Sequence, residues 1–263
     1  MYAFAYERPA SMADALAKIS AGGQALAGGQ TLIASLKQRL AQPESLIDLA
    51  GVAELSGIKK DGNSLVIGAM TRHETVADSA DVQAMIPALA ALAGGIGDRQ
   101  VRAMGTMGGS VANNDPAACY PSAVLGLGAT VQTNKRSIAA DDFFQGMYTT
   151  ALEEGELITA IHFPAPQKAA YAKFRQPASR FALVGVFVAQ TANGVRVAIT
   201  GAGNGVFRHA GLEAALSKSF TPEAVEGVAI DAGELNGDLH ASAAYRAQLV
   251  KVQTQKAVQQ ANG

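Results

Sequence analysis

Hydrophobic and polar positions follow helix and strand periods in turn over the first fifty residues. Apolar positions at helical spacing over 12–19, opened by Ser11 as a capping residue, predict a helix. Short apolar runs at 25–27 and 45–49 predict strands, and a second apolar stripe over 32–40 predicts a helix between them. This part of the chain is therefore expected to alternate helix and strand.

A β-hairpin is expected next. An Asp-Gly pair at 61–62 supplies the positive φ angles that a two-residue turn needs between the runs 57–60 and 64–68. Apolar positions over 82–93 follow helical spacing, whereas the glycine-rich tract 94–109 has few strong helix or strand signals. Since long irregular tracts in compact domains are usually functional, this tract is a candidate for ligand binding.

The remaining pattern predicts more strands and a helical end. Strand and turn signals occur at 124–132 and 138–144, and a further strand is expected over 156–163. An apolar hairpin about an Asn-Gly pair is predicted over 181–200, and the last helix over 241–260.

The polar, proline-flanked segment 164–168 is typical of a linker, so we expect a domain boundary near residue 170. The predicted division is a first domain of residues 1–170, with subdomains of about 1–56 and 57–170, and a second domain of residues 171–263. The mixture of helices and strands predicts the α+β class.

Composition and charge exclude several classes of function. With 49% hydrophobic and 16% charged residues, the 263-residue chain is typical of globular proteins. A net charge of −1 without basic runs argues against nucleic acid as a partner. The single cysteine, Cys119, excludes an internal disulfide framework and a cysteine-ligated zinc site or iron–sulfur cluster held by this chain alone. Any such centre is expected on another subunit.

The chain start lacks the pattern of a secretory signal, and no apolar run reaches the length of about eighteen residues that suggests a membrane helix. A cytoplasmic protein without membrane insertion is expected, with export of a complex on a partner's signal as the alternative.

The first candidate binding element is a glycine pair between a predicted strand and a predicted helix. Glycines allow a ligand to approach the backbone, and free N–H groups at such a turn attract anions such as a pyrophosphate. An ordinary turn is the alternative, and the spacing is not that of the Rossmann fingerprint. The residues are Ala27, Gly28, Gly29, Gln30, Thr31 and Leu32.

The second candidate places a Gly-Gly pair between two hydroxyl groups, followed by side-chain amides and a carboxylate. This set suits hydrogen bonds to a polyol or a phosphate, with a capped loop as the alternative. Two such loops in one α+β unit favour a dinucleotide that lies between them. The stretch is 105–116, in which Asn113 and Asn114 are the amides, and the contact residues chosen from it are Thr106, Gly108, Gly109, Ser110, Asn114 and Asp115.

Neither loop offers a nucleophile with its base. The four histidines His73, His162, His209 and His240 are scattered without a metal-ligand spacing, and we interpret each as a surface or satisfied structural histidine. Cys119 is interpreted as a buried, inert thiol. We expect no metal site and no catalytic side chain, so an organic cofactor has to supply any chemistry.

Eight short motifs, taken in order, carry a resemblance to a known family. They are 4–9 (FxYxxP), 27–32 (AGGQTL), 67–71 (IGAMT), 98–102 (DRQVR), 105–110 (GTMGGS), 142–146 (DFFQG), 155–158 (GELI) and 238–246 (DLHASAAYR). At these separations, and over nearly the whole chain, the sequence resembles the FAD-binding subunit of molybdenum hydroxylases, the xanthine dehydrogenase and carbon monoxide dehydrogenase family.

The resemblance implies an α+β fold with a two-part FAD-binding domain of the vanillyl-alcohol-oxidase (PCMH) type and a smaller α+β C-terminal domain. It also implies one noncovalent FAD and two kinds of partner: a large subunit with a molybdenum pterin cofactor and a small subunit with [2Fe–2S] clusters. The assembly would be a heterotrimer or a dimer of heterotrimers.

The function implied is electron transfer, from the iron–sulfur clusters through FAD to an external acceptor that could be NAD, oxygen, a quinone or a protein. The compound oxidised is bound by another chain and stays undetermined. Two alternatives remain open: a free-standing flavin oxidoreductase of the same fold, and a scaffold subunit that has lost FAD.

The resemblance also assigns roles to single residues. The backbone of 27–32 would hold the pyrophosphate, and the second glycine loop would line the opposite side. Ile96 and Ile158 correspond to contacts with the flavin rings, and Lys173 to a basic side chain near the cofactor.

Two positions depart from the family pattern. Cys119 stands where the family usually has an Asp that accepts hydrogen bonds from FAD hydroxyls, and a thiol is a poor acceptor. Phe181 stands where some relatives have a Tyr over the flavin, so the stacking surface is kept and the hydroxyl is lost.

Overall fold

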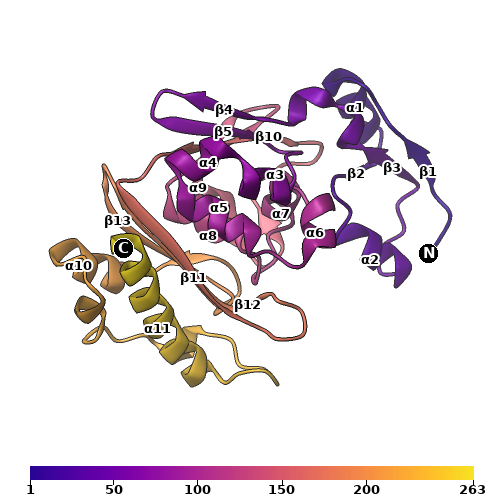
Figure 1. Cartoon of the computed structure of the whole chain (residues 1–263). Coiled ribbons are helices and arrows are strands. Elements are labelled where there is room, and N and C mark those ends of the chain that lie inside the picture. The colour runs from indigo at the N-terminus through magenta and orange to yellow at the C-terminus, as the bar shows by residue number, and fades with distance from the viewer.

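Three sheets follow one another along the molecule, from the N-terminal to the C-terminal end (Figure 1). The computed structural model describes residues 1–263. A parallel three-stranded sheet comes first, an antiparallel five-stranded sheet second and an antiparallel four-stranded sheet last. Most of the helices lie between the second and third sheets (Figure 1).

The first sheet is built by the helix–strand alternation that the sequence predicts. Its strands, in spatial order, are β1 (Ala5–Glu7), β3 (Ser45–Asp48) and β2 (Gln24–Leu26). Helix α1 (Met12–Ser20) is capped by Ser11, whose Oγ accepts a hydrogen bond from the Asp14 N–H at 3.2 Å. Helix α2 (Leu32–Lys37) connects β2 to β3. The predicted helices and strands of this region are confirmed.

The second sheet contains the predicted hairpin at one edge. Its order is β4 (Ile58–Asp61), β5 (Ser64–Gly68), β10 (Ile158–Pro164), β6 (Thr130–Thr133) and β7 (Ser137–Ala139). Asp61 pairs with Ser64, and Gly62 has a φ of +57°, which favours glycine. The central strand β10 pairs with β5 on one side and β6 on the other, so the long insertion between β5 and β6 begins and ends at the two strands that flank β10.

That insertion is mostly helical and forms much of a core of 30 buried residues. Its helices are α3 (His73–Asp78), α4 (Ala80–Met85), α5 (Pro87–Gly94), α6 (Arg99–Met104), α7 (Met107–Asn113) and α8 (Tyr120–Gly126). After β7, helix α9 (Ala140–Phe143) and the short pair β8 (Phe144–Gly146) and β9 (Thr149–Thr150) complete the unit. Two 3-10 turns, η1 (Leu49–Gly51) and η2 (Ala53–Leu55), link the first and second sheets.

Three predictions for this unit are wrong in detail. The tract 94–109 is not irregular, because Asp98 caps α6 and Thr106 caps α7 with their side-chain oxygens. The run 124–132 begins inside α8, a helix with a proline near its start, and its strand portion begins only at Thr130. The apolar stretch 82–93 is two helices, because Pro87 begins a new one.

The third sheet contains the predicted apolar hairpin, which is confirmed. Its order is β11 (Lys168–Arg175), β12 (Ala182–Thr191), β13 (Gly194–Thr200) and β14 (Phe207–Arg208). The short strand β14 was not predicted, since the sequence favoured helix after residue 200. Gly194 in the turn has a φ of +114° and pairs with Thr191.

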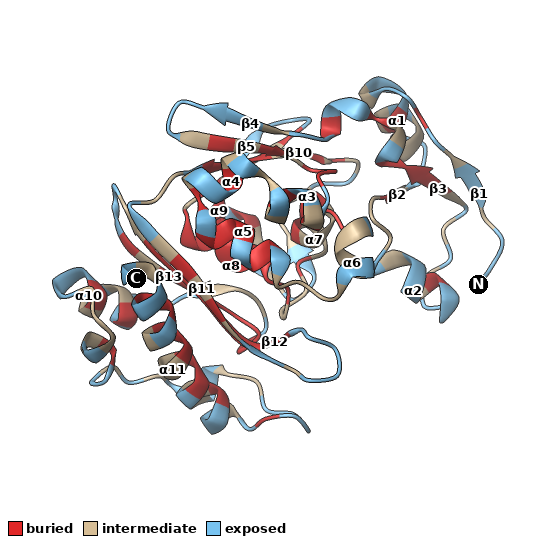
Figure 2. Cartoon of the chain, in the orientation of Figure 1, coloured by how far each residue is buried: buried red, intermediate tan, exposed pale blue.

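Strand β12 is buried on both faces (Figure 2). Phe187 and Ala189 belong to the 30-residue core, whereas Val186 and Val188 belong to a second core of 18 residues on the other face. That second core is covered by α10 (Ala210–Lys218), α11 (Ala243–Asn262) and the 3-10 turns η3 (Pro222–Val225) and η4 (Ala232–Glu234). Burial on both faces explains why β12 is continuously apolar rather than alternating. No helix here combines the length and apolar character that crossing a bilayer would take.

Candidate functional site

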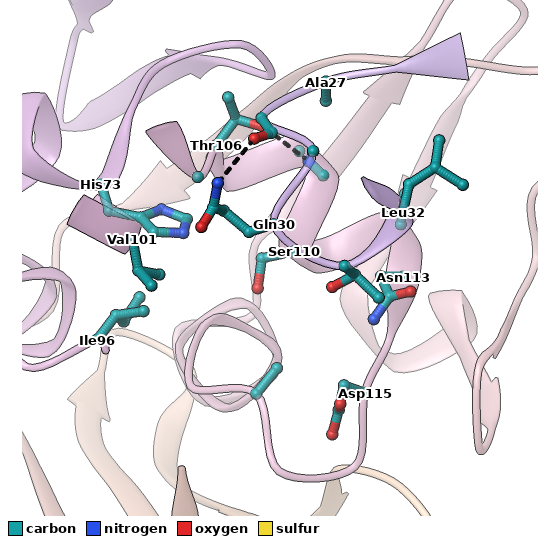
Figure 3. Close-up of a pocket in the computed structure, with 18 of the residues that line it drawn as sticks. Ala27, Gln30, Leu32, His73, Ile96, Val101, Thr106, Ser110, Asn113 and Asp115 are labelled. Atoms are coloured by element: carbon teal, nitrogen blue, oxygen red, sulfur yellow. Dashed lines mark hydrogen bonds between the residues drawn. The ribbon is translucent and has the colours of Figure 1, made fainter. Parts of the chain in front are cut away.

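A cavity of about 710 Å³ opens where the first sheet, the helical insertion and the third sheet meet. The turn between β2 and α2, the start of α7, the N-terminal end of α8 and the turn between β11 and β12 contribute its walls. Figure 3 shows part of the lining, with Gln30, Ser110 and His73 directed into the same space. Residues far apart in the sequence thus form one site.

The first glycine turn, residues 27–32, lines one wall of the cavity. Gly29 has a φ of +69°, a conformation that L-residues with a side chain rarely adopt. No side chain caps α2; the Ile33 N–H donates to the Gly29 carbonyl at 3.0 Å and the Ser35 N–H to the Thr31 carbonyl at 3.1 Å. The free N–H groups of this turn suit an anionic ligand.

The second glycine turn, residues 105–110, lines the opposite wall and is packed into the core. Thr106 Oγ1 accepts a hydrogen bond from the Gly109 N–H at 3.2 Å and so caps α7. A Cβ on Gly108 would lie 2.5 Å from the Cβ and 2.8 Å from the carbonyl oxygen of Ala69. Glycine at 108 is therefore required for close packing against Ala69, the residue after β5, rather than for the approach of a ligand.

The two turns also touch each other. A Cβ on Gly28 would lie 2.2 Å from the Met104 carbonyl oxygen and 2.7 Å from the Gly105 Cα. A Cβ on Gly109 would lie 3.3 Å from the Cβ of Ala27 and 2.8 Å from Thr106 Oγ1. The glycines thus allow two backbone segments to come into contact, and both segments line the same cavity.

Of the seventeen residues proposed from the sequence, sixteen line the cavity and one does not. Asn114 is fully buried with a φ of +44°, and its Nδ2 donates to the carbonyls of Gly146 at 2.7 Å and Thr149 at 2.8 Å. Its role is to hold the β8–β9 segment, so its assignment to the cavity is wrong. The neighbouring Asn113 lines the cavity instead.

Asp115, by contrast, lies on the cavity wall and is locally fixed. Its Oδ1 accepts from the Ala117 N–H at 2.8 Å, and its Oδ2 accepts from the Tyr148 hydroxyl at 3.3 Å. Burial and, to a smaller extent, the nearby Asp115 carboxylate raise the pKa of Tyr148, so this phenol stays protonated at neutral pH. Asp115 is therefore an oriented acceptor at the rim of the second turn.

Lys173 joins three segments around the cavity. Its Nζ donates to the carbonyl of Gly95 at 2.8 Å and that of Arg180 at 3.1 Å, and lies 3.4 Å from Cys119 Sγ. Cys119 is only 5% exposed but lines the cavity at the N-terminal end of α8. The departure from the family pattern at position 119 thus lies beside a lysine ammonium group.

Ile96, Ile158 and Phe181 contribute apolar side chains to the cavity lining. Phe181 is 48% exposed, so a large part of its ring is free for contact with a ligand. A planar aromatic group would be buried favourably against these three side chains.

Sequence reasoning gave no role in the site to three titratable residues of the lining, Glu156, His73 and Arg180. Glu156 forms two contacts of 3.1 Å with the Arg136 guanidinium and accepts from Thr133 Oγ1 at 2.7 Å. The pKa of Glu156 is lowered to about 2, chiefly by the hydrogen bond with Arg136. Hydrogen bonds from Thr133 and from the Glu153 N–H also lower it. This carboxylate is an ionised structural group with its acceptors already used.

His73 corrects the interpretation of the histidines. It is 4% exposed, lines the cavity, and its Nδ1 is buried without a hydrogen-bond partner, so it is neither a surface nor a satisfied structural histidine. The signal that could have identified it is its position directly after the 67–71 motif, which leads into the site.

The other residues of the lining, to which the sequence assigned no role in the site, are mostly small or apolar. They are Gln24, Ala25, Ser35, Leu40, Ala41, Leu49, Ala69, Met70, Gly97, Val101, Gly105, Ala112, Ala117, Ala118, Leu157 and Ser179. The lining thus combines turns that carry free N–H groups, hydroxyls and amides with apolar side chains. This combination suits a ligand that has both an anionic group and an aromatic ring system.

Three comparisons with known proteins bear on the site. The family model described as the FAD binding domain in molybdopterin dehydrogenase matches residues 2–166. The carbon monoxide dehydrogenase medium chain of Hydrogenophaga pseudoflava is 35% identical over 271 residues, covering 94% of each chain. The glyceraldehyde dehydrogenase medium chain of Sulfolobus acidocaldarius is 34% identical over 271 residues, covering 97% of this chain and 96% of that one.

The fold is also similar to solved structures. A crystal structure of the Cu,Mo-CO dehydrogenase in its cyanide-inactivated form contains a chain with a TM-score of 0.90 and 33% identity, covering 98% of this chain and 97% of that one. The similarity therefore extends over the third sheet and the C-terminal helices as well as over residues 2–166.

Proposed function

The chain belongs to the family of FAD-binding domains of molybdopterin dehydrogenases, and from this premise we propose that the cavity binds one noncovalent FAD for electron transfer. The predicted α+β fold of an FAD-binding medium subunit is confirmed by the same comparisons. The observation that carries the proposal is the pair of glycine turns that touch each other and face one cavity of about 710 Å³.

In this proposal the pyrophosphate lies between the turns 27–32 and 106–110, where backbone N–H groups and the hydroxyl of Ser110 are available. The aromatic rings lie against Ile96, Ile158 and Phe181. The cavity fits this ligand, because the two glycine turns can approach each other only without a Cβ at Gly28, and because the lining combines backbone N–H groups and hydroxyls with apolar side chains.

FAD supplies the electron transfer when it is bound, and the residues of this chain bind it, orient it and exclude water from it. Lys173 holds the Arg180 carbonyl and so keeps the turn that contains Phe181 against the cavity. Asp115 presents an oriented carboxylate, and Cys119 a thiol, toward the hydroxyl-bearing part of the ligand. No side chain is assigned a catalytic role.

The chain is an oxidoreductase subunit, and its relatives are named as medium chains, which implies large and small partner subunits. We propose that the large partner holds a molybdenum pterin, that the small one holds [2Fe–2S] clusters, and that the three assemble as a heterotrimer or its dimer. Relatives of this kind support the subunit over a free-standing flavin enzyme. A cytoplasmic location is part of the proposal, since a chain with one cysteine does not depend on an oxidising compartment.

A domain boundary near residue 170 is also part of this proposal. It is supported by the family match to residues 2–166 and by the start of the third sheet at Lys168.

The proposal is tested by FAD content and affinity. Gly29→Val and Gly109→Val are expected to abolish FAD binding. A side chain at Gly29 is strained by the positive φ and meets Ile33, and one at Gly109 meets Thr106 and Ala27, so each distorts a turn that lines the cavity. Gly227→Val is the matched control, since a Cβ at that glycine meets nothing within 4 Å. Apoprotein is titrated with FAD by flavin fluorescence, with circular dichroism to follow folding.

Full FAD occupancy in both glycine variants would contradict the proposed position of the cofactor. Acid denaturation of the loaded protein distinguishes the mode of attachment: flavin is expected in the supernatant, and flavin that stays on the protein would contradict noncovalent binding.

A further inference from the structure

His73 is a buried histidine whose environment the proposed FAD site does not yet explain. It begins α3, at the point where its own N–H donates to the Gly105 carbonyl at 3.0 Å, and it is 4% exposed. Its Nδ1 is enclosed without a partner. In Figure 3 its ring projects toward the space that Gln30 and Ser110 also face. A buried polar ring on a cavity wall needs a physical reason.

The imidazole of His73 is uncharged at neutral pH. Burial, followed by the positive charge of Arg102, lowers the pKa of His73 from 6.5 to about 4. The Arg102 side chain is itself held nearby, with Nη1 donating to the Ile96 carbonyl at 3.0 Å. The other titratable neighbour is Tyr120, whose ring centroid is 5.2 Å from that of His73, and burial keeps this phenol protonated by raising its pKa. A neutral imidazole has one N–H donor and one acceptor nitrogen.

The position of the hydrogen follows from the two nitrogens' surroundings. Nδ1 is buried and meets no acceptor, so an N–H there would be an orphaned buried donor, which is rare in proteins. Nε2 is the nitrogen next to Gly105, since a Cβ built on that glycine would lie 2.5 Å from it. Unlike Nδ1, Nε2 is not enclosed without a partner, and His73 lines the cavity, so the Nε2–H tautomer is the one that can find a partner there.

We propose that His73 donates a hydrogen bond from Nε2–H to bound FAD, at its ribityl–flavin half. This inference rests on the proposed function. The assignment to this half follows from the neighbours of His73: in Figure 3 its ring lies between Thr106, beside the expected pyrophosphate, and the apolar side chains of Val101 and Ile96. The acceptor is therefore an oxygen or nitrogen of the ligand beyond the pyrophosphate.

The first experiment needs no variant. The chain has four histidines, so ¹⁵N-histidine labelling gives few ring resonances, and His73→Gln assigns the one of interest. The apoprotein is expected to show the Nε2–H tautomer for His73, and saturation with FAD is expected to shift that nitrogen while ADP leaves it unmoved. ADP is the probe because it carries the pyrophosphate and lacks the flavin. A Nδ1–H tautomer, or a resonance that FAD leaves unmoved, would overturn the inference.

The second experiment compares His73→Phe with His73→Gln. Phe keeps a ring in the core and removes the donor, so the FAD dissociation constant is expected to rise about three- to tenfold, the range for one lost neutral hydrogen bond. Gln retains an N–H donor and is expected to recover most of the affinity. ADP affinity is expected to be the same in all three proteins, which a merely structural effect on the second turn would not allow.

The outcomes separate the two proposals. If the wild-type chain binds no FAD, the proposed function itself fails. If it binds FAD while His73→Phe keeps the wild-type dissociation constant, only the hydrogen bond from His73 is wrong. Should His73→Phe fail to fold, the nitrogen resonances of the wild-type protein decide.

Discussion

The two glycine turns that face the cavity have similar sequences but different surroundings. In the first turn, α2 has no side-chain cap, and the atom nearest to a Cβ on Gly29 would be Cδ1 of Ile33, the end of a flexible side chain. In the second turn, Thr106 caps α7, Gly108 packs on the backbone of Ala69, and Gly105 packs on His73. At Gly29 the first turn is thus free of backbone contacts, whereas the second turn is part of the core at Gly105 and Gly108.

The same local motif, a glycine pair at the start of a helix, can thus either leave backbone free for a ligand or allow close packing in the core. Changes in the second turn are expected to lower the free energy of unfolding even without FAD, because core packing is lost. Changes in the first turn are expected to act mainly on FAD affinity. Measuring both quantities for matched variants tests whether the distinction holds.

The largest effect is expected for Gly108→Val. Its side chain would collide with Ala69 backbone and side-chain atoms, and overpacking of this kind costs about 3 kcal/mol of unfolding free energy. Urea denaturation of the apoprotein measures it. Gly227→Val, in open space, is the control and is expected to change stability by no more than about 0.5 kcal/mol. If Gly108→Val were as stable as the wild type, the conclusion that the second turn packs in the core would be wrong.

The next effect concerns pH and His73, which packs on the second turn. Because the folded pKa of about 4 lies below the ordinary 6.5, the unfolded chain binds a proton first as pH falls. The contribution of His73 is therefore fully present above pH 6.5 and is lost as pH falls toward 4. Between pH 7 and 5 this amounts to about 2 kcal/mol.

Urea denaturation of wild type and His73→Gln at both pH values isolates this contribution. The difference in stability between the two proteins is expected to shift in favour of the variant at pH 5. Equal shifts in both proteins would show that the imidazole is not protonated preferentially in the unfolded chain.

Two threonines provide a smaller, matched comparison. Thr106→Ala removes the cap of α7 and is expected to cost about 1 kcal/mol of stability. Thr31→Ala, at the start of α2, removes no capping hydrogen bond and is expected to change stability by less than about 0.5 kcal/mol. Thermal or urea unfolding of the apoproteins measures both, and equal losses would erase the distinction between the turns.

The smallest effect is expected at Cys119, next to the second turn. Cys119→Asp adds a carboxylate that can accept from FAD hydroxyls, but Lys173 Nζ, 3.4 Å from the present sulfur, shares it. FAD affinity is expected to rise by about three- to tenfold, which corresponds to roughly 1 kcal/mol. Cys119→Asn is the neutral control in the same titration. Unchanged or weaker binding of the Asp variant would mean that position 119 does not face the FAD hydroxyls.

Much of the fold and site could be predicted where local signals agree with packing. The hairpin at 61–62 and the helix opened by Ser11 follow from turn and capping chemistry alone. The two glycine turns were found because a strand ends before the first and hydroxyl groups flank the second. These features depend on neighbours in sequence, which a single chain displays directly.

The errors arise where tertiary contacts decide. Asn114 is in a polar cluster by sequence, but its left-handed backbone turns the side chain toward β8 and β9, and Asn113 faces the cavity. His73 could not be placed because its burial depends on α6 and α8, which pack on α3 from elsewhere in the chain. Helices α6 and α7 were not predicted because the glycines of the tract 94–109 disfavour helix. The capping residues Asp98 and Thr106 were therefore not recognised as helix starts.

Lys173 has a consequence for how the protein is made. It belongs to β11 of the third sheet, yet its ammonium group is bonded to Gly95 and holds the turn before β12 at the cavity. A chain that emerges from the ribosome N-terminus first completes both glycine turns long before residues 173–181 are available. The chain is therefore expected to bind the cofactor stably only after the third sheet has begun to form. A nascent chain that ends soon after the second glycine turn is expected not to retain it.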